Sequence, residues 1–289
     1  MSDNTAPDVS VTLLTRNAGP LLERVLRAIR EQKTDLRVEI VAVDSGSTDK
    51  TREILAQYGA RVSVIPPESF NFGLTRDLVF EQSSAPIVIS LSQDAVPAHA
   101  QWLEHLVAPL AENNVAVSCG RSLPDEARQE PQFIWERNGR FYFTREMRTF
   151  FQRYGRGLSN SNAAYMRSVW SRLRFGEQSI GEDFRMQTKL HAENLAIAFP
   201  DDAPVLHHHN YTLKTLFARC RNEGRGLCQL GCPYSAAAMM LDIANTTTMA
   251  TWCRELLRGR LTTPAALLFP LVRPFGVYVG SRRAKSVMP

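Results

Sequence analysis

Short apolar segments alternate with segments of helical periodicity over the first 120 residues, and this alternation restricts the fold more than any other feature. Residues 9–14 form an apolar run rich in β-branched side chains, and residues 22–29 then place leucine, valine and isoleucine at helical spacing. Further strand-like segments lie at residues 38–43, 61–65, 86–92 and 115–119, with helical segments at 74–82 and 101–111. This order predicts an α/β fold with an open, mostly parallel sheet and helices on both faces.

Polar residues follow three of these strands at the point where each strand ends. In an open parallel sheet, ligands bind at the carboxyl ends of the strands. We therefore expect the three polar clusters to meet in one crevice. The candidate binding residues are Thr15, Arg16, Asn17, Asp44, Ser45, Gly46, Ser47, Gln93 and Asp94.

Asp44 ends the second strand and precedes a Ser-Gly-Ser loop. Gly46 allows the backbone to approach a ligand closely, and the amides at the start of the following helix point toward the loop. Because a carboxylate repels phosphate, Asp44 is better suited to accept hydrogen bonds from a base N–H or a ribose hydroxyl. The alternative is an ordinary strand-to-helix turn capped by aspartate and serine.

Asp94 follows a largely apolar strand, where a carboxylate is costly unless it is paired or binds a cation. A divalent ion that bridges diphosphate oxygens would stabilise Asp94 and would neutralise charge on a leaving group. The alternative is an aspartate that forms the turn before Val96 and Pro97.

Three consecutive histidines, His207, His208 and His209, form the most unusual run in the chain. On an extended backbone His207 and His209 share one face, while His208 points the other way. Together with Asp94, these two imidazoles would provide mixed nitrogen and oxygen ligands for Mn²⁺ or Mg²⁺. The alternative is that the histidines are structural.

An acidic pair and one arginine complete the candidate chemistry. Glu182 and Asp183 stand at an expected helix start, where one of them could take a proton from an attacking hydroxyl. The alternative is that both only favour the helix dipole. Arg76 could bind phosphate through its planar guanidinium, or it could be an ordinary arginine near a helix start.

The C-terminal segment carries most of the positive charge. The whole chain has a net charge of +5, whereas residues 250–289 contain seven basic residues and one acidic residue. Mixed with apolar side chains, this charge suggests either a contact with an anionic membrane surface or a solvated helical hairpin. Because no recognisable nucleic-acid-binding motif accompanies the charge, we expect no nucleic-acid partner.

Taken in order, these segments resemble the family 2 glycosyltransferases with the GT-A fold, a Rossmann-like sheet. Residues 41–49 resemble the nucleotide-binding strand and loop of that family, and residues 92–95 fall at its metal-binding D-x-D motif. The resemblance implies that Thr15, Asn17 and Asp44 contact the nucleotide, that Asp94 binds metal and diphosphate, and that Asp183 is the catalytic base.

A narrower likeness points to bacterial rhamnosyltransferases that use dTDP-L-rhamnose. It rests on the segments Phe-Asn-Phe-Gly at 70–73, Thr-Arg-Asp at 75–77, Gln-Asp-Ala at 93–95 and the histidine run before an aromatic residue and threonine. The sequence departs from that pattern at Phe72, where a histidine is usual, and at Asp77, where an asparagine is usual. Ser92 stands where many GT-A enzymes have the first aspartate, as in the rhamnosyltransferase-like group.

We expect a catalytic domain over residues 8–215, an insertion over the site at 121–158 and a basic, mainly helical extension at 216–289. No apolar run approaches the about 20 residues that span a bilayer, and the polar, acidic start is unlike a secretion signal. The expected location is therefore the cytoplasm, with a peripheral contact at the inner face of the membrane.

The expected activity is inverting, metal-dependent transfer of a sugar, L-rhamnose from dTDP-L-rhamnose, to a hydroxyl of a saccharide or lipid-linked acceptor in bacterial surface polysaccharide synthesis. Within the same fold, a UDP- or GDP-sugar donor is the alternative. A catalytically silent nucleotide-sugar-binding subunit and a nucleotidyltransferase are the alternatives from other classes. Expected cofactors are Mg²⁺ or Mn²⁺.

Overall fold

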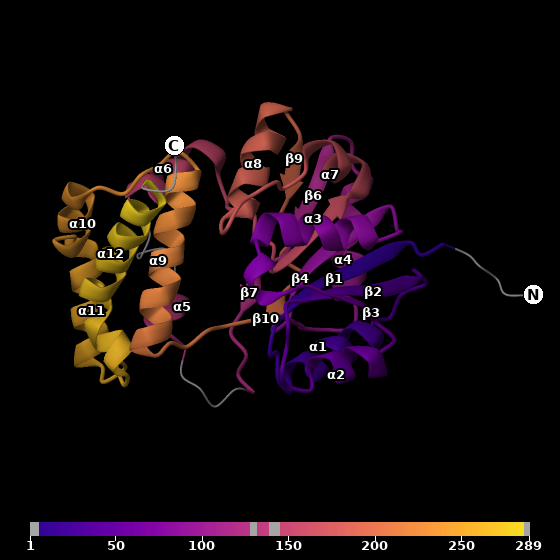
Figure 1. Ribbon diagram of the computed structural model, residues 1–289, viewed down its shortest axis with the longest axis horizontal. Coiled ribbons are helices and arrows are strands. Elements are labelled where there is room, and N and C mark those ends of the chain that lie inside the picture. Colours follow the sequence, from indigo (N-terminus) through magenta and orange to yellow (C-terminus); the bar gives the residue numbers. More distant parts are fainter. Residues whose placement is uncertain (1–5, 128–131, 139–144, 286–289) are drawn as a thin grey trace, which may run out of the picture. The chain divides into compact units, whose positions relative to one another are not determined.

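The computed structural model describes residues 6–127, 132–138 and 145–285 (Figure 1). The chain divides into two compact units. The sheet unit comprises residues 1–123, 157–177 and 182–207, and the helical unit comprises residues 124–156, 178–181 and 208–289.

A seven-stranded sheet forms the centre of the sheet unit. Its strands, in spatial order, are β3 (Arg61–Val64), β2 (Val38–Asp44), β1 (Val9–Thr15), β4 (Ile87–Ser92), β8 (Asn162–Met166), β6 (Val115–Cys119) and β9 (Ala196–Ala198). Neighbouring strands run parallel except β8, which is antiparallel to both β4 and β6. The mostly parallel sheet that the sequence predicts is therefore confirmed, with one reversed strand inside it.

Helices cover both faces of this sheet (Figure 1). They are α1 (Leu21–Arg30), α2 (Thr51–Gln57), α3 (Phe72–Gln82), α4 (Trp102–Val107), α7 (Arg167–Leu173) and α8 (Glu182–Ala192), with short 3₁₀ turns η1 (Pro67–Ser69) and η2 (Ala108–Ala111). On one face, Leu13 of β1 belongs to an apolar core that includes Trp102 of α4. On the other face, Val43 of β2 shares a second core with Phe80 of α3 and Met186 of α8. Alternate strand residues thus fill opposite cores, as a sheet covered on both faces requires.

A small second sheet brings two distant segments together. It consists of β5 (Val96–Pro97), β10 (Val205–Leu206) and β7 (Ser122–Leu123), with β10 in the middle. Val96 is the register partner of Leu206 in the antiparallel pair of β5 and β10. The pairing places the residues just before β5 beside the residues just after β10.

The helical unit contains α5 (Ile134–Asn138), α6 (Arg145–Tyr154), α9 (Leu213–Gln229), α10 (Ala236–Ile243), α11 (Thr246–Leu257) and α12 (Pro264–Lys285). Thr212 caps α9 through a reciprocal pair of hydrogen bonds with Thr215. Among the described residues, no helix has both the length and the apolar character that crossing a membrane requires.

Glycines allow α9 and α12 to pack closely along their length (Figure 1). A Cβ atom added to Gly280 would lie 1.9 Å from the carbonyl oxygen of Arg221, and one added to Gly276 would lie 2.7 Å from the Cβ of Cys220. A salt bridge of 2.6 Å joins Arg273 of α12 to Glu223 of α9. One side of α12 is therefore fixed against α9.

The structure divides the chain differently from the sequence. The expected insertion at 121–158 was assigned to the catalytic domain, but residues 124–156 belong to the helical unit. The reason is aromatic packing within that unit, where the Phe133 ring lies 5.2 Å from Tyr211 and 5.8 Å from Phe269.

Because Gly280 has no room for a side chain, we expect Gly280→Ala to destabilise the helical unit by about 1–3 kcal/mol through overpacking. Chemical or thermal unfolding followed by circular dichroism measures the change. Leu271→Ala is the control on the same helix, since Leu271 is 55% exposed, and it should change stability by less than about 0.5 kcal/mol. Equal stability of Gly280→Ala and the parent would contradict the close packing.

Candidate active site

The polar clusters that follow β1, β2 and β4 meet at one edge of the sheet. Thr15 is the register partner of Asp44, and Leu14 is the register partner of Ser92. The ends of the three strands are therefore level with one another, and the loops that follow them lie side by side. This arrangement is the one that binds ligands in open α/β sheets.

Asp44 is completely buried and organises the loop that follows it. Its Oδ2 accepts hydrogen bonds from the Thr15 hydroxyl at 2.9 Å and from the Ser47 hydroxyl at 2.5 Å, and its Oδ1 accepts one from the Ser47 backbone amide at 2.8 Å. These bonds compensate the cost of burying the carboxylate. The sequence suggested that Asp44 contacts the nucleotide, whereas the structure directs both oxygens to the protein's own loop.

The loop after β1 is tied to both of its neighbours. The Asn17 amide donates to the Ser47 hydroxyl at 2.8 Å, and the Asn17 side chain accepts from the Thr48 amide at 2.9 Å. On the other side, the Gln93 side chain accepts from the Arg16 amide at 2.9 Å and donates to the Arg16 carbonyl at 3.3 Å. Asn17 holds this shape with a positive φ of 44°, which asparagine tolerates better than most residues.

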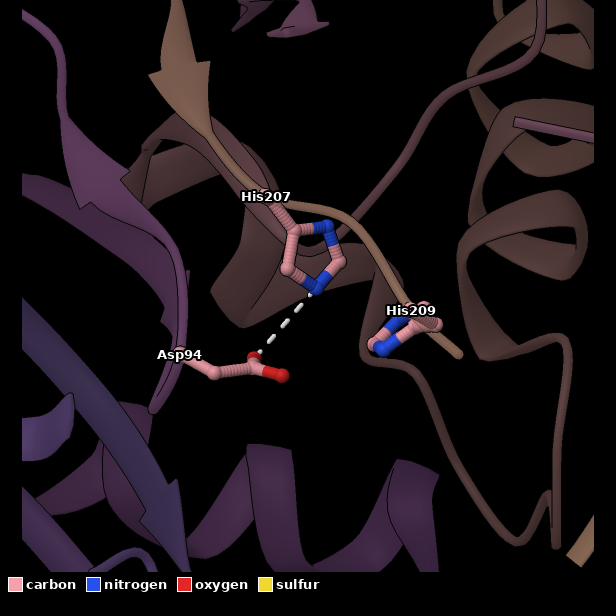
Figure 2. A group of neighbouring side chains, drawn as sticks. All are labelled: Asp94, His207 and His209. Carbon is pink, nitrogen blue, oxygen red and sulfur yellow. Dashed lines mark ion pairs between the residues drawn. The ribbon is translucent and has the colours of Figure 1, made fainter. Parts of the chain in front are cut away.

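Asp94, His207 and His209 lie together (Figure 2). One ligand atom from each residue lies within 4.8 Å of the others, and Asp94 Oδ1 is 3.3 Å from His207 Nε2. The pairing of β5 with β10 explains why Asp94 meets His207, and His209 follows two residues farther along the chain. His208 points elsewhere, since its Nδ1 accepts a hydrogen bond from the Asp125 amide at 3.1 Å.

The donor set of this cluster fits a divalent cation. A carboxylate oxygen and two imidazole nitrogens suit Mn²⁺, and the side chains of Asp94 and His207 remain 28% and 13% exposed. A cation and its other ligands therefore have access to these atoms from solvent.

The acidic pair begins α8, and its first member is held in a buried network. Glu182 Oε1 accepts hydrogen bonds from Arg76 Nε at 3.1 Å and from the Asn160 side chain at 2.9 Å. The Tyr165 hydroxyl donates to Asn160 in turn. The network fixes Glu182 at the start of α8 and thereby orients its neighbour Asp183.

Arg76 has different partners from those that the sequence suggested. Its side chain is only 8% exposed, and its guanidinium contacts Glu182 and donates to Ser90, so it is not directed toward solvent as a phosphate ligand would be. The Ser90 hydroxyl donates onward to the Asn160 carbonyl at 2.6 Å. Arg76 thus holds Glu182, the first member of the acidic pair, in place.

The Asp183 carboxyl has a pKa shifted upward by its surroundings. The residue is half-buried at the start of α8. Burial, together with the negative charge of Glu182, raises the pKa of Asp183 to about 7, against the opposing effects of its hydrogen bond from the Phe184 amide and the charge of Arg76. A carboxyl with this pKa can exchange a proton near neutral pH.

Sequence reasoning missed Ser90, Asn160 and Tyr165. Ser90 lies inside an apolar strand, which is an unusual place for a hydroxyl, and Asn160 lies in the polar run just before β8. These were the available signals. Asp77, one of the departures from the rhamnosyltransferase pattern, has a structural role, since it accepts hydrogen bonds from Trp170 Nε1 at 2.8 Å and from the Gly176 amide at 2.9 Å.

Comparison with known proteins agrees with the fold. The family model described as "Glycosyl transferase family 2" matches residues 10–174, more than half of the chain. The chain belongs to this family. It is therefore a glycosyltransferase in class, and the alternative of a nucleotidyltransferase is wrong.

Two curated relatives are also similar in sequence. The glycosyltransferase is 31% identical to the O-antigen chain rhamnosyltransferase WbaN of Salmonella anatum and 32% identical to the O-antigen chain rhamnosyltransferase RfbN of Salmonella typhimurium. Each match extends over 226 residues, which are 75% of this chain and 71% of the relative.

Solved structures share the fold. A mannosyltransferase from Pyrobaculum calidifontis, in complex with GDP-Man and Mn²⁺, has a TM-score of 0.62 at 18% identity and covers 98% of this chain and 88% of its own. Glucosyl-3-phosphoglycerate synthase from Mycobacterium tuberculosis, in complex with Mg²⁺ and UDP, has a TM-score of 0.60 at 24% identity and covers 79% and 81%. The predicted GT-A fold is thus confirmed.

The buried pair of Arg76 and Glu182 leads to a stability prediction. Arg76→Met leaves a buried carboxylate without its cation, so we expect a loss of about 3–5 kcal/mol in the free energy of unfolding. The double variant Arg76→Met with Glu182→Met should lose much less than the sum of the two single variants. Urea unfolding of the four proteins measures the coupling, and additive losses would show that the two side chains do not interact.

Proposed function

We propose that this family 2 glycosyltransferase transfers L-rhamnose from dTDP-L-rhamnose, with inversion, to a hydroxyl of a lipid-linked saccharide in surface polysaccharide synthesis. The observation that carries the proposal is the level ending of β1, β2 and β4, with Asp94 next to His207 at the same strand ends. The choice of donor is supported by the names of the two curated relatives and by the Gln-Asp-Ala and histidine segments. UDP- or GDP-sugars remain the alternative donors.

The proposed nucleotide site consists of the strand-end loops. Gly46 has a φ of +76°, and a Cβ at this position would lie 2.8 Å from Pro67, so glycine is required for this loop shape. Asp44 acts by holding the loop, and the loop then presents its polar groups to base, ribose and diphosphate. The residues of this proposed site, in which Asp44 has the structural role, are Thr15, Arg16, Asn17, Asp44, Ser45, Gly46, Ser47, Gln93 and Asp94.

Asp94, His207 and His209 are the proposed ligands of Mg²⁺ or Mn²⁺. A bound divalent cation supplies neutralisation of the negative charge that develops on a departing diphosphate. Both solved relatives named above are complexes with such cations, Mn²⁺ in one and Mg²⁺ in the other. The donor set of this chain fits the same chemistry.

Asp183 is the proposed catalytic base. Its carboxylate takes the proton of the acceptor hydroxyl, whose oxygen forms the new bond to the anomeric carbon. The bond from that carbon to the diphosphate breaks on the opposite face, so the nucleoside diphosphate leaves and the configuration inverts. Arg76 and Asn160 act as positioning residues, because they hold Glu182 and with it the start of α8.

The two compact units suggest a division of labour. In this proposal the sheet unit, with the core of the expected domain at 8–215, binds the donor and carries the base. The helical unit, with the expected extension at 216–289, contacts the anionic membrane surface that bears the acceptor. This places the protein on the inner face of the membrane as a peripheral protein.

Removal of the base provides the first test. Asp183→Asn should lower kcat by roughly 10²–10⁴-fold while donor binding is retained, because only the proton acceptor is lost. The matched control is Glu177→Gln, an exposed acid a few residues earlier, which should leave kcat unchanged. Turnover by Asp183→Asn at the parental rate would overturn the assignment of the base.

The pH dependence provides a second test of the same residue. A base works in its deprotonated form, so kcat/KM should rise with pH and level off above an apparent pKa close to 7. Glu182→Gln removes the neighbouring negative charge, which should move the midpoint to lower pH. An unchanged midpoint in this variant would show that Glu182 does not influence the titrating group.

The metal assignment is tested by binding rather than by activity. Calorimetric titration of dTDP with and without Mn²⁺ should show tighter binding with the cation, and Asp94→Ala or His207→Ala should remove at least about tenfold of this gain. Asp201→Ala, which changes an acid 82% exposed at its side chain, is the control. If Asp94→Ala keeps the full effect of Mn²⁺, Asp94 is not a ligand.

A further inference from the structure

One side of α12 presents large apolar side chains to solvent. Leu267, Leu268, Leu271 and Phe275 are 40%, 44%, 55% and 52% exposed. Their spacing along the helix places all four within one narrow stripe, about 100° wide. The opposite side of α12 is occupied by its close contact with α9, so the stripe is not the buried face of this helix.

Neighbouring helices continue this apolar surface on both sides. The Phe217 ring of α9 lies 6.0 Å from the Phe275 ring. On the other side, Trp252 Nε1 of α11 donates to the Leu267 carbonyl at 3.2 Å, and Leu256, one turn farther along α11, is 43% exposed. The docking face is defined by Phe217, Leu256, Leu267, Leu268, Leu271 and Phe275.

The exposed charge of α10, α11 and α12 is positive. Residues 236–284, all of which the structure describes, contain only two acidic residues. Glu255 is 1% exposed at its side chain and pairs with Arg137 at 3.0 Å, and Asp242 is 12% exposed and accepts a hydrogen bond from the Tyr234 hydroxyl at 2.6 Å. The exposed charged residues of this segment are Arg254, Arg258, Arg260, Arg282 and Arg283, and helical spacing places Arg282 in the stripe with Leu271 and Phe275.

The end of the stripe combines an aromatic ring with a cation. The Arg282 guanidinium lies 5.9 Å from the centre of the Tyr278 ring, and its Nη1 is 3.2 Å from the Tyr278 hydroxyl. Tyrosine and arginine of this kind suit the boundary between acyl chains and lipid headgroups.

We propose that the docking face lies on an anionic lipid surface, with Leu267, Leu271 and Phe275 inserted among the acyl chains and with Arg282 and Arg283 on the headgroups. The helix lies in the plane of the surface, because its other side is fixed to α9 by Gly276 and Gly280. A second copy of the chain is a poorer occupant, since two docking faces would bring like charges together. The inference extends the proposed membrane contact of the basic segment to a defined helix face.

Vesicle sedimentation of the full chain tests the inference. The protein should bind vesicles of phosphatidylcholine with phosphatidylglycerol more tightly than vesicles of phosphatidylcholine alone, and added salt should weaken this preference. The double variant Leu271→Asn with Phe275→Asn should reduce the vesicle partition coefficient at least about tenfold, because two apolar side chains no longer enter the acyl layer. Val64→Asn, at an equally exposed valine of the sheet unit, should bind like the parent.

The charge contribution has its own variant. Arg282→Gln with Arg283→Gln should weaken binding to the anionic vesicles and leave the weak binding to neutral vesicles unchanged. Thermal unfolding of every variant shows whether the fold is retained.

Three results would overturn the inference. They are absence of binding to anionic vesicles at low salt, parental binding by the Leu271→Asn and Phe275→Asn variant, and a dimer in solution that this variant dissociates. Sedimentation needs neither donor nor acceptor. A negative result would therefore leave the proposed transfer reaction untouched, and an inactive enzyme that still binds vesicles would leave the docking face intact.

Discussion

The parallel pairing of β1 with β2 on one side and with β4 on the other is the constraint on which the rest of the sheet unit depends. Because Thr15 is level with Asp44 and Leu14 with Ser92, three loops from distant parts of the sequence leave the sheet at one edge. Asp44 then connects two of these loops, and Gln93 connects the third to Arg16. The position of the candidate donor site is therefore set by strand register, and single side chains only add contacts to it.

Two further contacts add candidate chemical groups, one beside that edge and one at the start of α8. The short pair of β5 and β10 brings His207 to Asp94, which creates a group of candidate cation ligands from segments more than one hundred residues apart. The buried contact of Arg76 with Glu182 holds the start of α8 and places a negative charge beside Asp183. Burial, together with that charge, raises the pKa of Asp183 to about 7, where a carboxyl can accept a proton near neutral pH.

The sequence predicted those features of the fold and the site that depend on local hydrophobic pattern and on polar residues at strand ends. Alternating apolar and helical segments revealed the sheet, and polar residues at strand exits revealed the loops around Asp44 and Asp94. It could not predict the burial of Arg76. The local sequence around an arginine near a helix start does not differ between an arginine that binds phosphate and one that pairs with a buried carboxylate. The assignment of residues 124–156 to the helical unit depends on Phe133 contacting Phe269, a long-range contact that leaves no local signal.

The most direct test of the account is calorimetric titration of the full chain with dTDP-rhamnose, UDP-glucose and GDP-mannose in the presence of Mn²⁺. Because the three strands end level with one another and their loops are held in place, we expect one saturable binding site per chain. The proposed donor, dTDP-rhamnose, should bind at least about tenfold more tightly than the other two, a difference of about 1.4 kcal/mol in binding free energy. Preference for UDP-glucose or GDP-mannose would contradict the proposed donor. Failure to bind any of the three would contradict the strand-end site itself.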